Sequence, residues 1–183
     1  RLLSAGGFAL FALGLGLSMV QTPETDGDAM FWPQVVRGVA IMFCLLPPTR
    51  MALGGLDLKR VPDASGMFNL MRNLGGAIGL ALIDTVIYSR STLHANAIVR
   101  KLIEGDVATA KFVGIPLDRF LAEGPGPIDT VRQALMQPLV EKAGLTLAIN
   151  DAWMMIAALT LTVVLFIPFA RRTKEPVGSE ERP

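Results

Sequence analysis

The stretch MFNLMRNLGGAIGLALIDTV, residues 67–86, is an apolar run of helix length with an arginine, Arg72, inside it. A charged side chain at the centre of a bilayer costs roughly 2.5–3.5 kcal/mol on insertion scales. Either this segment lies outside a membrane, or the arginine is kept there for a purpose. The rest of the chain decides between the two.

The composition is that of a membrane protein. The chain has 183 residues, of which 51% are hydrophobic and 18% charged, and its mean hydropathy is +0.48. Soluble domains carry about 25% charged residues. Residues 2–23 and 152–170 hold no charge at all, and each run is long enough to cross about 30 Å of hydrocarbon. The run at residues 2–23 is too long for a signal peptide, and it lacks the basic n-region of one beyond Arg1.

We therefore predict an all-α integral membrane protein with four spans. Residues 1–90 are expected to hold three of them, and residues 150–170 the last. The expected bounds are about 2–20, 31–53, 65–88 and 150–170. Residues 91–149 would form a long loop outside the cytoplasm, and residues 171–183 a cytoplasmic tail. Because the chain opens at Arg1 directly before an apolar run, we expect a fragment of a longer membrane protein.

Orientation follows from the basic residues of the short connections. The connection 21–30 holds three acids and no base, whereas the connection 54–64 and the tail 171–183 are basic. This predicts that both ends of the chain are cytoplasmic and that the acidic loop faces outside. Aromatic residues that favour the membrane interface would then mark the outer ends of spans. They are Trp32, Tyr88 and Trp153.

The outer loop has helical spacing in two places, residues 93–103 and 128–145, with the turn EGPGP at 123–127 between them. We expect two short amphipathic helices lying on the outer surface. Pro138 should break or kink the second one. His94 lies in the first, where a lone histidine is most often only solvated.

Six polar residues lie inside the expected spans and mark faces turned toward protein or water, because lipid offers them no partners. They are Gln34, Arg37, Asn69, Arg72, Asn73 and Asp84. Arg37 and Asp84 both lie near the outer ends of their spans, so one hypothesis pairs them. The other leaves Asp84 alone in an outer vestibule.

Arg72 shares one helix face with Gly75, Gly76 and Gly79, at i, i+3, i+4 and i+7. Gly75 and Gly79 form a GxxxG pattern, which allows close helix approach. Close packing against a neighbouring helix would explain the glycines. It would not explain Arg72, because such packing does not need a guanidinium. We expect Arg72 to face a water-accessible cavity between helices.

Two features remain open or absent. Pro47 and Pro48 in the second span indicate either a hinge or a fixed kink. The single cysteine, Cys44, rules out an intramolecular disulfide and is expected to be a buried spectator. The sequence has no metal-ligand spacing and no nucleophile or phosphate-loop motif, so an enzyme is disfavoured and no metal is expected. The net charge of +1 gives no reason to expect nucleic acid.

Three segments carry a resemblance to a known family: RLLSAGGFALFALGL, VVRGVAIMFCLLPPTRMALGGL and ASGMFNLMRNLGGAIGLALIDT. Together with AINDAW before the last span, they resemble the final helices of the major facilitator superfamily. The nearest type is the fourteen-spanner drug:proton antiporter branch, the EmrB/QacA-like multidrug exporters. The resemblance covers nearly the whole chain.

The resemblance implies the last four transmembrane helices of a proton-driven exporter of small hydrophobic compounds in a bacterial inner membrane. It implies no cofactor beyond the proton gradient. Its partners would be the lipid bilayer, the missing N-terminal half and a periplasmic adaptor protein. The coupling carboxylates would lie mainly in the missing half. Two alternatives stay open: a stand-alone four-helix scaffold or assembly subunit, and an importer on the same fold.

Overall fold

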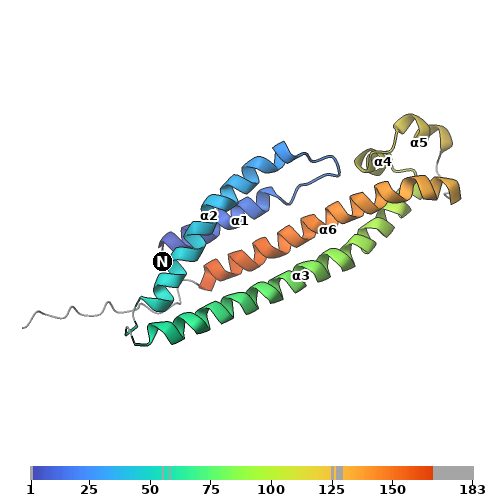
Figure 1. Ribbon diagram of the computed structural model, residues 1–183. Helices are drawn as coiled ribbons and strands as arrows, with labels where there is room; N and C mark the ends of the chain where they lie inside the picture. The colour runs from blue at the N-terminus through green and yellow to red at the C-terminus, as the bar shows by residue number, and fades with distance from the viewer. Residues whose placement is uncertain (1, 55, 58, 125, 127–129, 167–183) are drawn as a thin grey trace, which may run out of the picture.

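The computed structural model describes residues 2–54, 56–57, 59–124, 126 and 130–166, and within them the chain is helical with short connections. Two antiparallel pairs form the body, α1 with α2 and α3 with α6, and α1 also packs along α6 (Figure 1). The two short helices α4 and α5 lie at the far end of the α3–α6 pair. The helices are α1 (Leu2–Leu17), α2 (Gly27–Leu53), α3 (Val61–Ile103), α4 (Val107–Val113), α5 (Leu117–Glu123) and α6 (Thr130–Phe166).

Helix α1 lies between α2 and α6 because its small residues let both approach. A Cβ added at Gly7 would come within 2.6 Å of Phe43 Cβ, which lies on α2. The buried side chains of α1 include Ala12 and Leu15, and Ser18 is buried in the turn directly after the helix. The Ser18 hydroxyl donates to the Gly14 carbonyl at 3.1 Å, so this buried polar group is satisfied by the last turn of α1.

The α3–α6 pair is much longer than a bilayer is thick. Its helices have 43 and 37 residues, which at 1.5 Å per residue gives about 65 and 55 Å against about 30 Å of hydrocarbon. Both helices must therefore project from a membrane. They touch closely at Gly144, where an added Cβ would lie 3.0 Å from Ala95 N and from Ser91 O.

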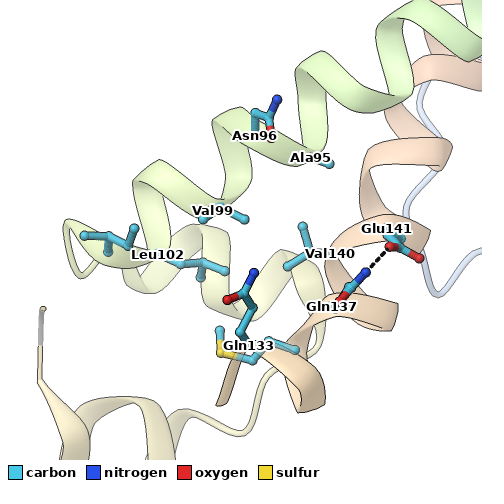
Figure 2. A pocket seen from close by; sticks show the side chains of 10 residues that line it. Ala95, Asn96, Val99, Leu102, Gln133, Gln137, Val140 and Glu141 are labelled. Carbon is cyan, nitrogen blue, oxygen red and sulfur yellow. Dashed lines mark hydrogen bonds between the residues drawn. The ribbon is translucent and has the colours of Figure 1, made fainter. Parts of the chain in front are cut away.

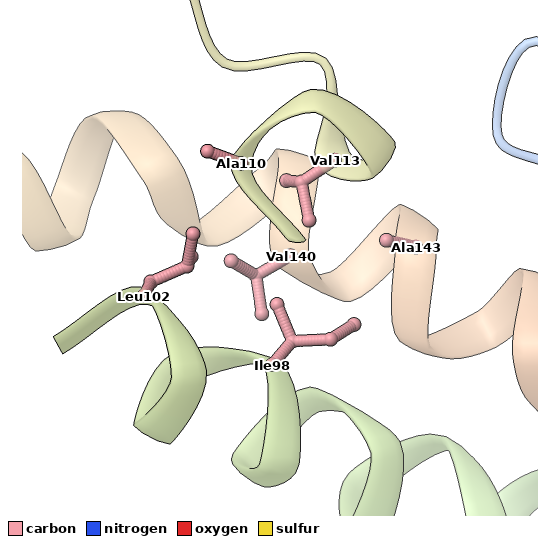
Figure 3. Close-up of a cluster of buried hydrophobic side chains, with 6 residues drawn as sticks. All are labelled: Ile98, Leu102, Ala110, Val113, Val140 and Ala143. Carbon is pink, nitrogen blue, oxygen red and sulfur yellow. The ribbon is translucent and has the colours of Figure 1, made fainter. Parts of the chain in front are cut away.

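The projecting end has a small hydrophobic core of its own, formed by α3, α4 and α6 (Figure 3). Asp106 caps α4 by accepting from the Ala108 N–H at 3.1 Å and the Thr109 hydroxyl at 2.6 Å. The hydrogen bond from Thr109 is the main cause that lowers the pKa of Asp106. Gly114 ends α4 with φ 84°, a left-handed conformation that glycine adopts without strain. The core residues are Ile98, Leu102, Ala110, Val113, Val140 and Ala143.

The helix bounds correct part of the sequence-based expectation for residues 91–149. Residues 93–103 are helical, but they continue α3 and do not form a separate surface helix. The second stretch is likewise the start of α6, which runs unbroken through Pro138. A break at Pro138 is therefore wrong, and the alternative, a kink at this residue, stays a prediction. Its ring is exposed at the surface, where water can satisfy the carbonyl one turn earlier that lacks an N–H partner.

Three helices of the described chain, α2, α3 and α6, are long and apolar enough to span a membrane, and α1 is apolar but shorter. Helix α1 begins, and the described part of α6 ends, near the connection between α2 and α3 (Figure 1). The acidic connection of α1 to α2 lies at the other end. Which compartment each end faces stays a prediction, and the tail 171–183 lies outside the described residues.

Candidate functional site

The membrane half of α3 carries the candidate site. The buried residues of α3 are Ile98 and Leu102, both in the projecting half. Partly buried residues of the membrane half recur with a seven-residue spacing, and Arg72 falls on the same face. Every residue from 69 to 78, Arg72 included, is nonetheless exposed in the described structure. The partly buried residues on this face are Val61, Ser65, Phe68, Gly79, Ile83 and Val86, and Ala64 and Ile87 lie at its edges.

The other polar residues expected on α3 are exposed as well. Asn69 and Asn73 lie within one turn of Arg72, whereas Asp84 lies twelve positions further on, about 18 Å along the axis. Within the described residues, no hydrogen bond or ion pair holds any of these four side chains. The structure thus groups Arg72 with the two amides and separates it from Asp84.

The glycines predicted as a packing seam have no neighbour among the described residues. A Cβ added at Gly75, Gly76 or Gly79 would meet nothing within 4 Å. Large apolar side chains of the same helix segment are also exposed, among them Leu70, Leu74 and Leu80. Any helix that packs against this seam is therefore not among those described, and the packing role of the glycines stays a prediction.

The residues expected on α2 lie apart from this face. Gln34 is exposed, and Pro47 and Pro48 are partly buried inside an unbroken helix. The guanidinium carbon of Arg37 lies 4.4 Å from the centroid of the Trp153 ring, on α6. The hypothesis that Arg37 pairs with Asp84 is wrong, because Arg37 reaches toward α1 and α6 and not toward α3.

A single turn of α6 contacts the other three long elements. The Asn150 side chain accepts from the Gln21 N–H at 3.2 Å and donates to the Gln21 carbonyl at 2.8 Å, which holds the loop after α1. Asp151 Oδ2 lies 2.8 Å from His94 Nε2 and 3.8 Å from Arg90 Nε, both on α3. With Trp153 against α2, residues 150–153 connect the helices at the end of the bundle where the acidic connection of α1 to α2 lies.

Sequence reasoning missed this turn and the true close-contact glycines. In the sequence, AINDAW is distinctive only through the family resemblance, and His94 is expected to be a solvated loop residue. Gly144, Ala148 and Ala152 recur every four residues and are buried, a small-residue stripe that was readable in the sequence. No sequence pattern showed which helix each residue would meet.

A cavity of about 450 Å³ lies between the projecting halves of α3 and α6 (Figure 2). Its walls include Val99, Leu102 and Val140, with the amides of Asn96, Gln133 and Gln137 at its edge. Gln137 donates to Glu141 at 2.8 Å across one turn of α6. The cavity is outside the membrane half and separate from the Arg72 face. Among the described residues, no group of three His, Cys, Asp or Glu side chains could hold a metal ion.

Comparison with known proteins identifies the class. The chain is 31% identical over 173 residues to the colistin resistance protein EmrB of Acinetobacter baumannii, which covers 92% of this chain and 33% of that protein. It is 27% identical to the multidrug export protein EmrB of Escherichia coli, over 86% of this chain and 29% of the relative. It is 26% identical to the MFS-type transporter ppz2 of Metarhizium majus, over 59% of this chain and 18% of the relative.

These relatives confirm the resemblance to multidrug export proteins of the major facilitator superfamily. More particularly, this chain is similar to the EmrB type along most of its length. It spans about a third of the length of the EmrB proteins it matches. No family model and no solved structure matches the chain.

Proposed function

We propose that this chain is the C-terminal part of a proton-coupled secondary transporter that exports small hydrophobic compounds by alternating access. The transporter would be a multi-pass protein of a bacterial inner membrane, with both ends of this chain in the cytoplasm. The remaining two thirds of the protein would supply the other half of the substrate path. The similarity to these relatives does not favour the stand-alone scaffold. The Escherichia coli relative is named an export protein, which supports export and not import.

The observation that carries the proposal is the exposed polar face of α3. Arg72 and Asn69 lie exposed on one face of an apolar helix segment, and Asn73 lies exposed about a quarter-turn further round the same helix. Groups of this kind at membrane depth mark substrate or ion pathways, because lipid cannot solvate them. The face is thus suited to line a watery route between the two halves.

Arg72 has the central role in this proposal, with Asn69 and Asn73 beside it. Its guanidinium would hydrogen-bond carbonyls or a carboxylate of the other half in one conformational state, a geometry that Lys does not reproduce. Gln34 on α2 and Asp84 further along α3, which lie apart from the Arg72 face, would contribute separate polar groups nearer the outer end of the transporter. The glycines at 75, 76 and 79 would let a helix of the missing half approach. Pro47 and Pro48 would give α2 a bend that moves or stays fixed.

The test is transport by the full-length protein in a strain that lacks its own drug exporters. Arg72→Ala and Arg72→Lys should reach the membrane at the parent's level and lose most of the resistance and dye efflux. Addition of a protonophore should stop efflux by the parent. Transport by Arg72→Ala equal to the parent at equal expression would refute the role of this residue.

Arg100→Ala is the matched control, since Arg100 is an exposed arginine of the same helix in the projecting half. It should transport like the parent. If efflux continues after the protonophore is added, proton coupling is contradicted, but the proposal that the protein exports these compounds still stands. A periplasmic adaptor is part of the proposal as well, and co-purification of one with the full-length protein would test it.

A further inference from the structure

Arg37 is a charged residue in an apolar helix, and it has no carboxylate partner among the described residues. The ion pairs of the described residues are both made by Asp151, with Arg90 and His94. Arg37 is nonetheless partly buried, and its side chain runs over α1 toward α6. A guanidinium in such a place needs another source of negative potential.

The face of the Trp153 ring supplies that potential. The Arg37 guanidinium carbon lies 4.4 Å from the ring centroid, well inside the range of about 6 Å over which an arginine is attracted to an indole face. The ring nitrogen of Trp153 is buried and has no hydrogen-bond partner within the described part of the chain. The position of the ring is therefore not set by its own polar atom.

Gly14 on α1 leaves the space through which the Arg37 side chain reaches the Trp153 ring. A Cβ added at Gly14 would lie 2.6 Å from Arg37 Cγ and 3.2 Å from Arg37 N. Any larger residue on α1 would push the arginine stem off its course, so three helices combine to fix one side chain. Gly14 belongs to α1, Arg37 to α2 and Trp153 to α6.

We propose that Trp153 is the positioning residue of Arg37. The indole face takes the place of a counter-ion and keeps the guanidinium on the α1–α6 side of α2, away from the polar face of α3. This pairing joins α2 to α6 across α1 near the outer end of the bundle. It does not depend on the proposed transport function, since it concerns how the helices hold one charge.

The experiment replaces Trp153 with tryptophans that carry one, two and three ring fluorines, by nonsense suppression in the intact protein. Fluorine withdraws electron density from the ring face and barely changes its shape. The melting temperature of the detergent-purified full-length protein should fall stepwise with each fluorine, by roughly 1 °C in total for a protein about three times as long as this chain. A ring that acts only by its shape would give a flat series.

Two controls separate the charge effect from other effects of fluorine. Trp32 is exposed and contacts Phe31 edge-on, so the same series at Trp32 should leave the melting temperature unchanged. In an Arg37→Met background the series at Trp153 should also be flat. A flat series in the parent, or an equal fall at Trp32 or in Arg37→Met, would overturn the proposal. Because the readout is thermal, its failure leaves the proposed transport function untouched.

Discussion

At the scale of single residues, some glycines of this chain contact a neighbouring helix closely and others face open space, and the sequence did not distinguish the two groups. The GxxxG pattern of α3 suggested packing, yet a methyl group added at Gly75 or Gly79 meets nothing among the described residues. Gly14 and Gly144, which raised no expectation, make the close contacts. The reason is that a small residue permits approach by a neighbour but does not say which neighbour exists. For the same reason, the sequence could not decide between the two hypotheses for Arg37 and Asp84, and the contact of Arg37 with Trp153 was not foreseen.

The contact at Gly144 gives a direct prediction. Gly144→Ala places a methyl group 3.0 Å from backbone atoms of α3, which cannot move aside as a side-chain end could. We expect overpacking to cost about 1–3 kcal/mol and to lower the melting temperature of the purified protein. Gly76→Ala, which adds the same methyl group in open space, is the control. Equal melting temperatures for both variants would show that the helices do not meet closely at residue 144.

Asn150 offers a second prediction at this scale. Its amide makes two hydrogen bonds to the backbone of Gln21, and Asn150→Ala leaves both backbone groups without these partners. The loss should cost roughly 1–3 kcal/mol. Hydrogen exchange at the loop after α1 should become faster, which mass spectrometry of the purified protein can measure. Asn96→Ala, on the exposed side of α3, should leave the exchange of that loop unchanged.

At the scale of helices, type and approximate place were readable, whereas lengths were not. Apolar runs predicted helices where α1, α2 and the membrane parts of α3 and α6 are found. The projecting stretches also showed their helical spacing. What the sequence did not show is that each stretch continues a span without a break, because nothing in residues 89–92 or 146–149 requires either continuation or a turn. Packing of α3 against α6 decides it.

Continuity of α3 can be measured by spin labelling. Single nitroxides placed at each residue from 84 to 103, in a Cys44→Ser background, should show mobility with one unbroken period of 3.6 residues. The most restricted labels should be those at 98 and 102, which replace buried side chains. If the periodicity of label mobility is interrupted near residues 89–92, α3 is not continuous, and the separate surface helix predicted from the sequence is correct.

At the scale of the whole molecule, the start of α1, the end of the described part of α6 and the connection between α2 and α3 lie at one end of the bundle. The acidic loop and the short helices lie at the other (Figure 1). This arrangement agrees with four antiparallel crossings, but only the bias of basic residues assigns compartments. Fold class followed from composition and periodicity. The order of neighbours, with α1 between α2 and α6, required contacts that no local pattern contains.

Topology can be tested with two introduced cysteines. In a Cys44→Ser background, Gly126→Cys should react with an impermeant thiol reagent added from the outside, and Ser179→Cys should not. The intact inner membrane shields the second site, and opening the cells should then expose it. Labelling of Ser179→Cys alone would invert the orientation.

The length of the α3–α6 pair has a mechanical consequence. From Arg72 to the end of α3 is about 46 Å, so a tilt of only about 10° around the level of Arg72 would displace the far tip by about 8 Å. Any tilt of the helices that the proposed transport cycle produces within the membrane would therefore be larger at the projecting end of the α3–α6 pair. A fluorescent label near Gln133, with its acceptor on the acidic loop, would follow each stroke of the molecule from the aqueous side.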